Sequence, residues 1–536
     1  MGLKFSDLYA APEVNPVNRK ARAVPFFNPI NVYGRVFFFS WFGFMIAFWA
    51  WYTFPPLLTA TIKNDLHLSA AEVANSNIVS LCATLLVRVV AGPLCDQFGP
   101  RKVFGGLLLL GALPVGLAPL VHDAQGLYVS RFFIGILGGS FVPCQVWATG
   151  FFDKNVVGTA NALTGGFGNA GGGITYFIMP AVYDSFVSRH YTPGQAWRLT
   201  FVVPLIMVIA TGVALLLLCP DTPTGRWSER HLQARMNLTA HGVVPTDDDV
   251  VVDVPGGITE KLPLPSSSSS ASASNHPEKV KKKTLDDNDK KPPPPPAAFD
   301  HEAQLSRTEI MLETAQGEII QKPSLGEALR VAVSPQTQFH VLTYMCSFGA
   351  ELAINAILAS YYVENFPALG QTDSANWAAM FGFLNFVTRP LGGVVSDVLY
   401  NFCGTRRNDN LWLKKAWINI CGVITGILLI VIGKLDPHNQ STMFGLVALM
   451  AIFLEAGNGA NFSLVPHVHP YANGILSGLT GAGGNLGGVL FAIIFRFTDN
   501  GSNYAHAFWV IGVIHVVVNV AVSWIPPLPK GQVGGH

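Results

Sequence analysis

The chain has 536 residues, half of them hydrophobic and only 12% charged, whereas soluble domains carry about a quarter charged residues. Its formal net charge of +1 and the lack of any basic tract interleaved with aromatics argue against nucleic-acid binding. The seven cysteines show no metal-ligand spacing, and no phosphate-binding loop or nucleophile–base pair stands out. We therefore predict an integral membrane protein with no cofactor, no metal site and no covalent catalysis.

Long apolar blocks determine the expected fold. They are about 20 residues long, the length that a helix needs to cross the hydrocarbon of a bilayer, as at 36–58 and 507–524. About six such blocks precede the polar central region and about six follow it. We predict an all-α membrane protein with twelve transmembrane helices, divided into an N-terminal half at 34–220 and a C-terminal half at 336–527.

The remaining segments are polar. Residues 1–33 are rich in proline and contain no cleavable signal peptide. Region 221–335 holds a serine run and five successive prolines at 292–296, a composition that cannot bury enough apolar surface to offset its ordering entropy. We expect a largely disordered central loop there, either a passive linker or a site for a regulatory kinase or other protein, and a short tail at 528–536.

Basic residues in the short connections predict the orientation. Connections on one side of the membrane are rich in them, as at Arg101 and Lys102, while the opposite side has little beyond Lys63, Arg189 and Lys434. Because cytoplasmic loops carry the excess of lysine and arginine, we expect both termini and the central loop in the cytoplasm.

Two motifs occur twice, in the same order. The spacing R-x3-G-x3-D is found at 88–96 and again at 389–397, and the pattern LTGxxGNxGG is found at 163–172 and again at 479–488. They fall in the second and fifth predicted spans of each half. Such duplication predicts two similar halves related by an axis along the membrane normal.

Arg88 lies eight residues deeper in its span than Asp96, which is about 12 Å at 1.5 Å per residue and close to the bilayer centre. Arg389 has the same depth in the other half. A guanidinium there costs at least about 2.5–3.5 kcal/mol, so each arginine either pairs with a buried acid, for which Glu351 and Glu455 are candidates, or faces a bound anion. The fork of an arginine matches an oxyanion, and we favour the anion.

The second motif places an asparagine among glycines. Asn169 shares a helical face with Gly165 and Gly172, and Asn485 has the equivalent place in the second half. The glycines allow helix backbones to approach closely. Since a buried amide is costly without partners, the asparagines either polarise a substrate site or bridge helices.

The paired motifs at 165–173 and 481–488 resemble the nitrate signatures of the nitrate/nitrite porter family, within the major facilitator superfamily. The superfamily's loop signature is similar to 92–102. Segments 33–44 and 466–474 look like those of filamentous-fungal high-affinity nitrate transporters. The resemblance covers nearly all of the chain outside the central loop, and it implies the major facilitator fold.

The resemblance also assigns substrate binding to two arginines, two asparagines and three aromatics: Arg88, Arg389, Asn169, Asn485, Phe141, Phe348 and Tyr344. It implies transport of nitrate, with nitrite as a second substrate, across the plasma membrane by alternating access. Residues alone leave two alternatives open, which are transport of another small or organic anion and a nitrate sensor that keeps the transporter fold.

Energetics predict the coupling ion. An anion that enters a cell works against about 2.3 kcal/mol per charge per 100 mV, so accumulation of nitrate requires co-transported cations, and the resemblance suggests protons. Glu351 and Glu455 are the candidate proton carriers, with Glu351 preferred because it lies one turn beyond Phe348. His467 and His469 are weaker candidates.

Overall fold

The computed structural model describes residues 5–16, 18–153, 156–229, 233, 236, 325–402, 407–469, 473–501 and 503–529. Most of the predicted central loop, including the proposed kinase target, and most of the predicted C-terminal tail lie outside these residues. The described part of the chain is almost entirely helical, as the sequence predicts.

The first half forms six spans. Their helices are α1 (Val32–Trp51) continuing through α2 (Pro55–Leu58), α4 (Ala70–Phe98), α5 (Pro100–Leu117), α6 (Ala124–Ile134) joined to α7 (Phe141–Phe151) by a 3-10 turn, α8 (Val157–Asn169) with α9 (Gly171–Val187), and α10 (Pro193–Thr200) with α11 (Val202–Leu218). A short helix, α3 (Thr61–Asp65), follows the first span.

The second half forms six more spans. They are α15 (Pro335–Asn365), α16 (Gly370–Leu384) with α17 (Thr388–Phe402), α18 (Arg407–Leu435), α19 (Gln440–Leu464), α20 (Asn473–Phe497) and α21 (Tyr504–Ala521), where α16 with α17 makes one span. These are five continuous helices and one interrupted helix, and together with the first half they account for twelve spans.

Among the described residues, eleven helical stretches are long and apolar enough to cross a membrane. The twelfth span is α8 with α9, whose pieces have 13 and 17 residues because the helix is interrupted at Ala170. The prediction of an all-α membrane protein with twelve transmembrane helices in two halves is therefore confirmed.

Part of the predicted disordered loop is helical. Helix α14 (Leu325–Ala332) directly precedes α15, inside the region that the sequence analysis treated as disordered. Its sequence, LGEALRVA, consists mostly of good helix formers, and Val331 is 1% exposed. The region expected to be disordered is therefore shorter at its C-terminal end.

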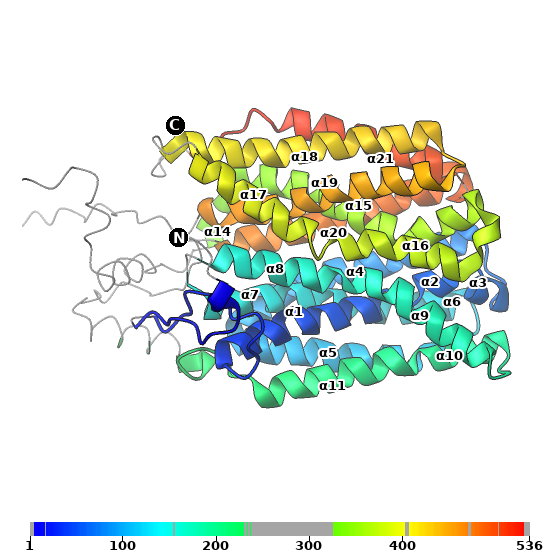
Figure 1. The fold of residues 1–536 in the computed structure, drawn as a ribbon, viewed down its shortest axis with the longest axis horizontal. Helices are drawn as coiled ribbons and strands as arrows, with labels where there is room; N and C mark the ends of the chain where they lie inside the picture. Colours follow the sequence, from blue (N-terminus) through cyan, green and yellow to red (C-terminus); the bar gives the residue numbers. More distant parts are fainter. Residues whose placement is uncertain are drawn as a thin grey trace, which may run out of the picture.

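The spans run along the long axis of Figure 1, with the first half (blue to green) below and the second half (green to red) above. Helices α1 and α15 begin, and α11 and α21 end, on the left; we call this the terminal side. The opposite side, where α2, α3 and α10 lie, is called the far side. Helix α4 packs against α20, and α9 against α16, so span two of each half meets span five of the other.

Glycines permit the closest contacts between the halves. A Cβ atom on Gly382 of α16 would lie 2.2 Å from the backbone nitrogen of Gly173 in α9. This distance is too short for any side chain, so only glycine fits at position 382. Gly173 of the glycine-rich motif therefore lets α9 and α16 approach closely, as the sequence predicts.

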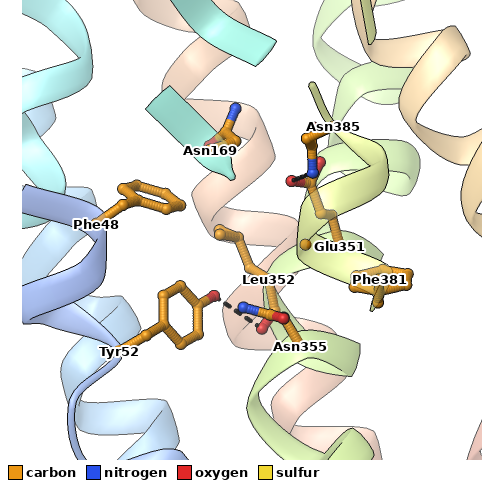
Figure 2. Close-up of a pocket in the computed structure, with 9 residues that line it drawn as sticks. Phe48, Tyr52, Asn169, Glu351, Leu352, Asn355, Phe381 and Asn385 are labelled. Atoms are coloured by element: carbon orange, nitrogen blue, oxygen red, sulfur yellow. Dashed lines mark hydrogen bonds between the residues drawn. The ribbon is translucent and has the colours of Figure 1, made fainter. Parts of the chain in front are cut away.

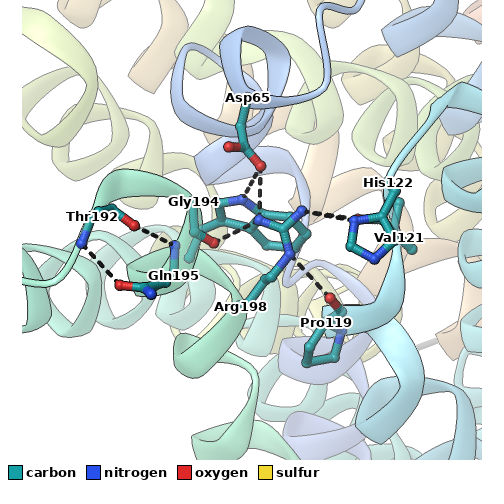
Figure 3. A network of polar contacts seen from close by, with 9 residues as sticks. Asp65, Pro119, Val121, His122, Thr192, Gly194, Gln195 and Arg198 are labelled. Atoms are coloured by element: carbon teal, nitrogen blue, oxygen red, sulfur yellow. Dashed lines mark hydrogen bonds and ion pairs between the residues drawn. The ribbon is translucent and has the colours of Figure 1, made fainter.

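Arg198 ties together the far-side connections of the first half (Figure 3). Its guanidinium donates to the Asp65 carboxylate at 2.8 Å and to the carbonyl oxygens of Pro119 and Val121, each at 3.1 Å. Burial opposes ionisation of Asp65, but hydrogen bonds from Trp197 and Arg198 outweigh that effect and lower its pKa. The sequence analysis did not count Arg198 among the basic residues of this side, and its charge is neutralised by Asp65.

The N-terminal segment packs against the bundle. Ala21 donates its backbone N–H to Phe151 at 2.9 Å, and the Asp153 carboxylate accepts hydrogen bonds from Asn15 at 3.2 Å and from Asn18 at 3.3 Å. Because Asn15 is fully buried, this polar segment is a folded cover of the terminal side. Its composition alone did not predict that.

Candidate functional site

Arg88 reaches the junction of the two halves from α4. Its Nε donates to the Gly138 carbonyl at 2.9 Å and its Nη1 reaches the Gly481 carbonyl of the other half at 3.5 Å. Its Cζ lies 4.9 Å from the ring centre of Phe141 and 5.3 Å from that of Phe348. Nη2 donates to no described protein atom, and no described carboxylate lies within ion-pair distance, so this side chain keeps a free donor inside the bundle.

Arg389 approaches the same ring from the other half. It lies in the first turn of α17, donates from Nη2 to the Tyr344 hydroxyl at 2.7 Å, and places Cζ 5.5 Å from the ring centre of Phe348. Its Nη1 lies 3.7 Å from a carboxylate oxygen of Glu351. Pairing with a buried acid, the less favoured interpretation, thus describes Arg389 in part and does not describe Arg88.

Three predicted aromatics lie together beside the arginines. The rings of Phe141 and Phe348 have centres 6.4 Å apart and planes 26° apart, and Tyr344 stacks on Phe348 at 5.0 Å. Sequence reasoning missed Phe462, whose ring meets Phe141 edge-on at 5.8 Å and Tyr344 at 5.0 Å. It follows Glu455 by seven residues on α19, a spacing that places both on one helical face.

The space between Phe141 and Phe348 nearly fits a flat ion. Carbon atoms make their best contacts at about 3.5–4.0 Å, so a planar ion with a ring on each face needs ring centres roughly 7–8 Å apart. The observed 6.4 Å is short of this by roughly 1 Å. The guanidiniums of Arg88 and Arg389 lie 5.3 Å and 5.5 Å from the ring centre of Phe348.

Two buried carboxyl groups lie behind Arg389. Glu351 accepts from Asn385 at 3.0 Å and from Asn458 at 2.7 Å. Glu455 accepts from the same Asn385 amide at 3.2 Å and makes a short contact with the Thr388 hydroxyl. The sequence named both acids as separate candidates, and it did not identify the shared asparagine that joins them.

The two signature asparagines have different surroundings. Asn485 donates from Nδ2 to the Gly481 carbonyl at 3.1 Å, the same carbonyl that Arg88 reaches. Neither amide atom of Asn169 is hydrogen-bonded to the protein, and the side chain lines a small cavity next to Glu351 (Figure 2). The equal roles that the repeated motif predicts are therefore not matched by equal geometry.

The two histidines lie away from this site. His467 and His469 follow α19 on the terminal side. Burial lowers the pKa of His467 to about 3, with the charge of Lys414 adding to the effect, and burial also lowers the pKa of His469. Both shifts favour the neutral form of the imidazole.

A further buried arginine escaped the sequence analysis. Arg131 of α6 is 3% exposed, donates from Nη1 to the Ser76 hydroxyl at 2.8 Å and contacts the Asn77 side-chain oxygen. No described carboxylate pairs with it. A search for charged residues inside the predicted spans would have found it, because the motif RFFIG stands in the middle of an apolar block.

Twelve spans in two similar halves, with charged and aromatic side chains from both halves meeting at the centre, define a membrane transporter that works without covalent chemistry. The chain belongs to the Major Facilitator Superfamily, whose family model matches residues 40–403. It is a secondary transporter and not an enzyme. This confirms the broader part of the resemblance described above.

Individual relatives divide between two kinds of substrate. The chain is 35% identical to Elsinochrome transporter 1 of Elsinoe fawcettii over 99% of this chain and 100% of that protein. It is 29% identical to High-affinity nitrate transporter 2.3 of Oryza sativa subsp. japonica over 90% of this chain and 76% of that protein. It is 26% identical to the Nitrate/nitrite transporter NrtP of Nostoc punctiforme, over 93% of each.

Proposed function

We propose that the protein imports nitrate, with nitrite as a second substrate, by alternating access. The observation that carries this proposal is the pair of arginines, one from each half, that stand against the ring of Phe348. Arg88 has no described carboxylate partner, and a small oxyanion would neutralise it and accept from its free Nη2. Because the site lies at the junction of the halves, rocking of one half on the other would expose it to either side in turn.

The shape of the site supports a flat ion. Phe141 and Phe348 are nearly parallel, and nitrate and nitrite are both planar, so each face of the ion would contact a ring while its edge receives the guanidinium donors. The named nitrate transporters among the relatives support the same choice.

Export of an organic compound is the second candidate, because the relative that is 35% identical is named for elsinochrome. The packing favours the small ion. Arg88, Phe141, Phe348 and Tyr344 are all at most 4% exposed, and the ring centres of Phe141 and Phe348 are only 6.4 Å apart. An organic anion would need a far larger separation of the halves than the roughly 1 Å that a flat ion requires between two rings.

Proton symport is the proposed energy source. The carboxyl groups of Glu351 and Glu455 share one asparagine amide, and two such groups in one site favour a proton between them. The Thr388 hydroxyl donates to the Leu384 carbonyl at 2.9 Å and also makes a short hydrogen bond to the Glu455 carboxyl, so this carboxyl group is held in place beside Glu351. At least two protons per nitrate would make import inwardly electropositive.

The plasma membrane is the proposed location, with both termini and the central loop in the cytoplasm. The terminal side carries the basic residues of the short connections, and Arg198 on the far side is neutralised by Asp65, so the bias that favours this orientation persists. The topology is tested by placing single cysteines in the central loop and labelling intact cells with an impermeant thiol reagent. Labelling would place the loop outside the cell and contradict the proposed orientation.

The test of the substrate is uptake of labelled nitrate in a host that lacks nitrate transport, with chlorate, nitrite, gluconate and elsinochrome as competitors. We expect saturable nitrate uptake, competition by chlorate and nitrite, and none by gluconate or elsinochrome. Arg88→Ala and Arg389→Ala should abolish uptake at unchanged surface abundance. Nitrate binding without uptake would indicate a sensor, and transport of elsinochrome without nitrate would establish the second candidate.

The test of coupling is the current and internal pH of voltage-clamped cells when nitrate is added. We expect inward current with internal acidification. Outward current without acidification would mean that nitrate enters alone and would refute symport.

A further inference from the structure

A small cavity lies between the two halves. It adjoins Glu351 and extends from there toward the far side of the bundle. Figure 2 shows Phe48 of α1, Tyr52 directly after α1 and Asn169 of α8 on one wall, and residues of α15 and α16 on the other. Its volume, about 10 Å³, is the room that one water molecule needs. The lining residues are Phe48, Tyr52, Asn169, Glu351, Leu352, Asn355, Phe381, Gly382 and Asn385.

The cavity wall carries polar atoms that have no protein partner. Both amide atoms of Asn169 and the side-chain oxygens of Asn355 and Asn385 make no hydrogen bond to the protein, although the three residues are only 1–5% exposed. An unpaired buried polar atom costs about 1–3 kcal/mol. A buried water makes two to four hydrogen bonds, so one water would satisfy most of these atoms.

The position of the cavity fits a route for protons. Glu351, Leu352 and Asn355 follow one another along α15 from the centre toward the far side, and the Tyr52 hydroxyl closes the cavity by donating to the Leu352 carbonyl at 3.1 Å. A proton that arrives from the far side therefore meets this cavity before it meets the carboxylate of Glu351.

Of the two signature asparagines, only Asn169 lines this cavity. Helix α20 continues unbroken past Asn485, whose amide bonds to the Gly481 carbonyl four residues earlier. In the first half, α8 ends at Asn169 and α9 begins at Gly171, and the equivalent bond is not made. Asn169 is thus left with both amide atoms available.

We propose that this cavity binds a water molecule which passes protons to Glu351, and that Asn169 positions this water and does not bind the anion. The proposal rests on the proposed symport. In the transfer, a proton on the water moves to a carboxylate oxygen of Glu351 and leaves neutral water; no electron moves.

The charged groups that face Glu351 favour such a relay. Arg389 of α17 and Arg88 of α4 hold positive charge near it, Glu455 of α19 shares its asparagine, and the hydroxyls of Tyr344 and Tyr52 stand on either side along the span. The positive charges stabilise the carboxylate between transfers, and the second acid offers the next place for the proton.

The matched pair Asn169→Ala and Asn485→Ala tests the proposal. Asn169→Ala removes two partners of the water. At saturating nitrate, we expect the proton concentration for half-maximal uptake to rise roughly tenfold, a shift of about one pH unit toward acid. The nitrate concentration for half-saturation, measured at acid pH, should not change. The second removes the support behind Arg88, and we expect the opposite, weaker nitrate binding with an unchanged pH profile. Asn169→Ser, which keeps a polar group for the water, should restore the pH profile.

Surface abundance and the solvent isotope effect on nitrate-evoked current are measured alongside. If Asn169→Ala does not reach the membrane, Asn355→Ala takes its place with the same expected shift. Weaker nitrate binding by Asn169→Ala with a wild-type pH profile overturns the inference and leaves nitrate transport standing. Absence of any nitrate uptake by the wild-type chain overturns the proposed function itself.

Discussion

Replacing Arg88 with lysine separates the arginine fork from its charge. Arg88 uses Nε for the Gly138 carbonyl at 2.9 Å and keeps Nη2 unbonded, so it can hold its place in the protein and donate to an anion at the same time. A lysine has a single side-chain nitrogen and cannot bond to the Gly138 carbonyl and donate to the anion in the same arrangement. The substitution thus removes one charge-assisted hydrogen bond from the bound anion while the positive charge remains.

Such a bond contributes about 1.5–3 kcal/mol, which corresponds to roughly a 10- to 150-fold rise in the nitrate concentration for half-maximal uptake. Uptake kinetics with labelled nitrate, normalised to surface abundance, measure it. Arg189→Lys, at an exposed position after α9, is the matched control and should leave the kinetics unchanged. Wild-type half-saturation in Arg88→Lys would refute the fork as the anion ligand.

Three further changes have expected outcomes. Tyr344→Phe removes the hydroxyl that accepts from Arg389, leaves a buried donor unpaired at about 1–3 kcal/mol, and should raise the half-saturating nitrate concentration in uptake assays at least about fivefold. Gly382→Val forces a side chain to within 2.2 Å of the facing backbone and should lower Tm and surface abundance, unlike Gly445→Val, where nothing lies within 4 Å. The pKa of Asp65 is lowered in the folded protein, so its carboxylate stabilises the fold at pH values above the ordinary carboxyl pKa of about 3.9. This stabilisation is lost as the pH falls through the lowered pKa of Asp65. Asp65→Asn should therefore lower Tm at pH 7 and make Tm fall less steeply in acid.

Part of the candidate site could be predicted from the sequence because a membrane strongly restricts which residues its spans can contain. Arginines in the middle of apolar spans are expensive, so Arg88 and Arg389 could be identified without any structure, and the repeat placed them at equal depth. The structure brings both to Phe348. Phe462 and Asn385 were missed because a phenylalanine or an asparagine in a span carries no comparable cost signal, and only their neighbours give them a role.

The amino-acid sequence by itself determined the class of protein, the number of spans and the two-half organisation. It could do so because the length of apolar blocks and the spacing of repeated motifs are local properties of the chain. Tertiary structure decided what surrounds each of two chemically identical residues. Asn169 and Asn485 have the same motif around them, yet Asn169 lines a cavity, while Asn485 donates to the Gly481 carbonyl that Arg88 also reaches. Some hydrogen bonds at the junction join residues hundreds of positions apart, as Arg88 to Gly481 and Tyr52 to Leu352 do, and no local pattern predicts them.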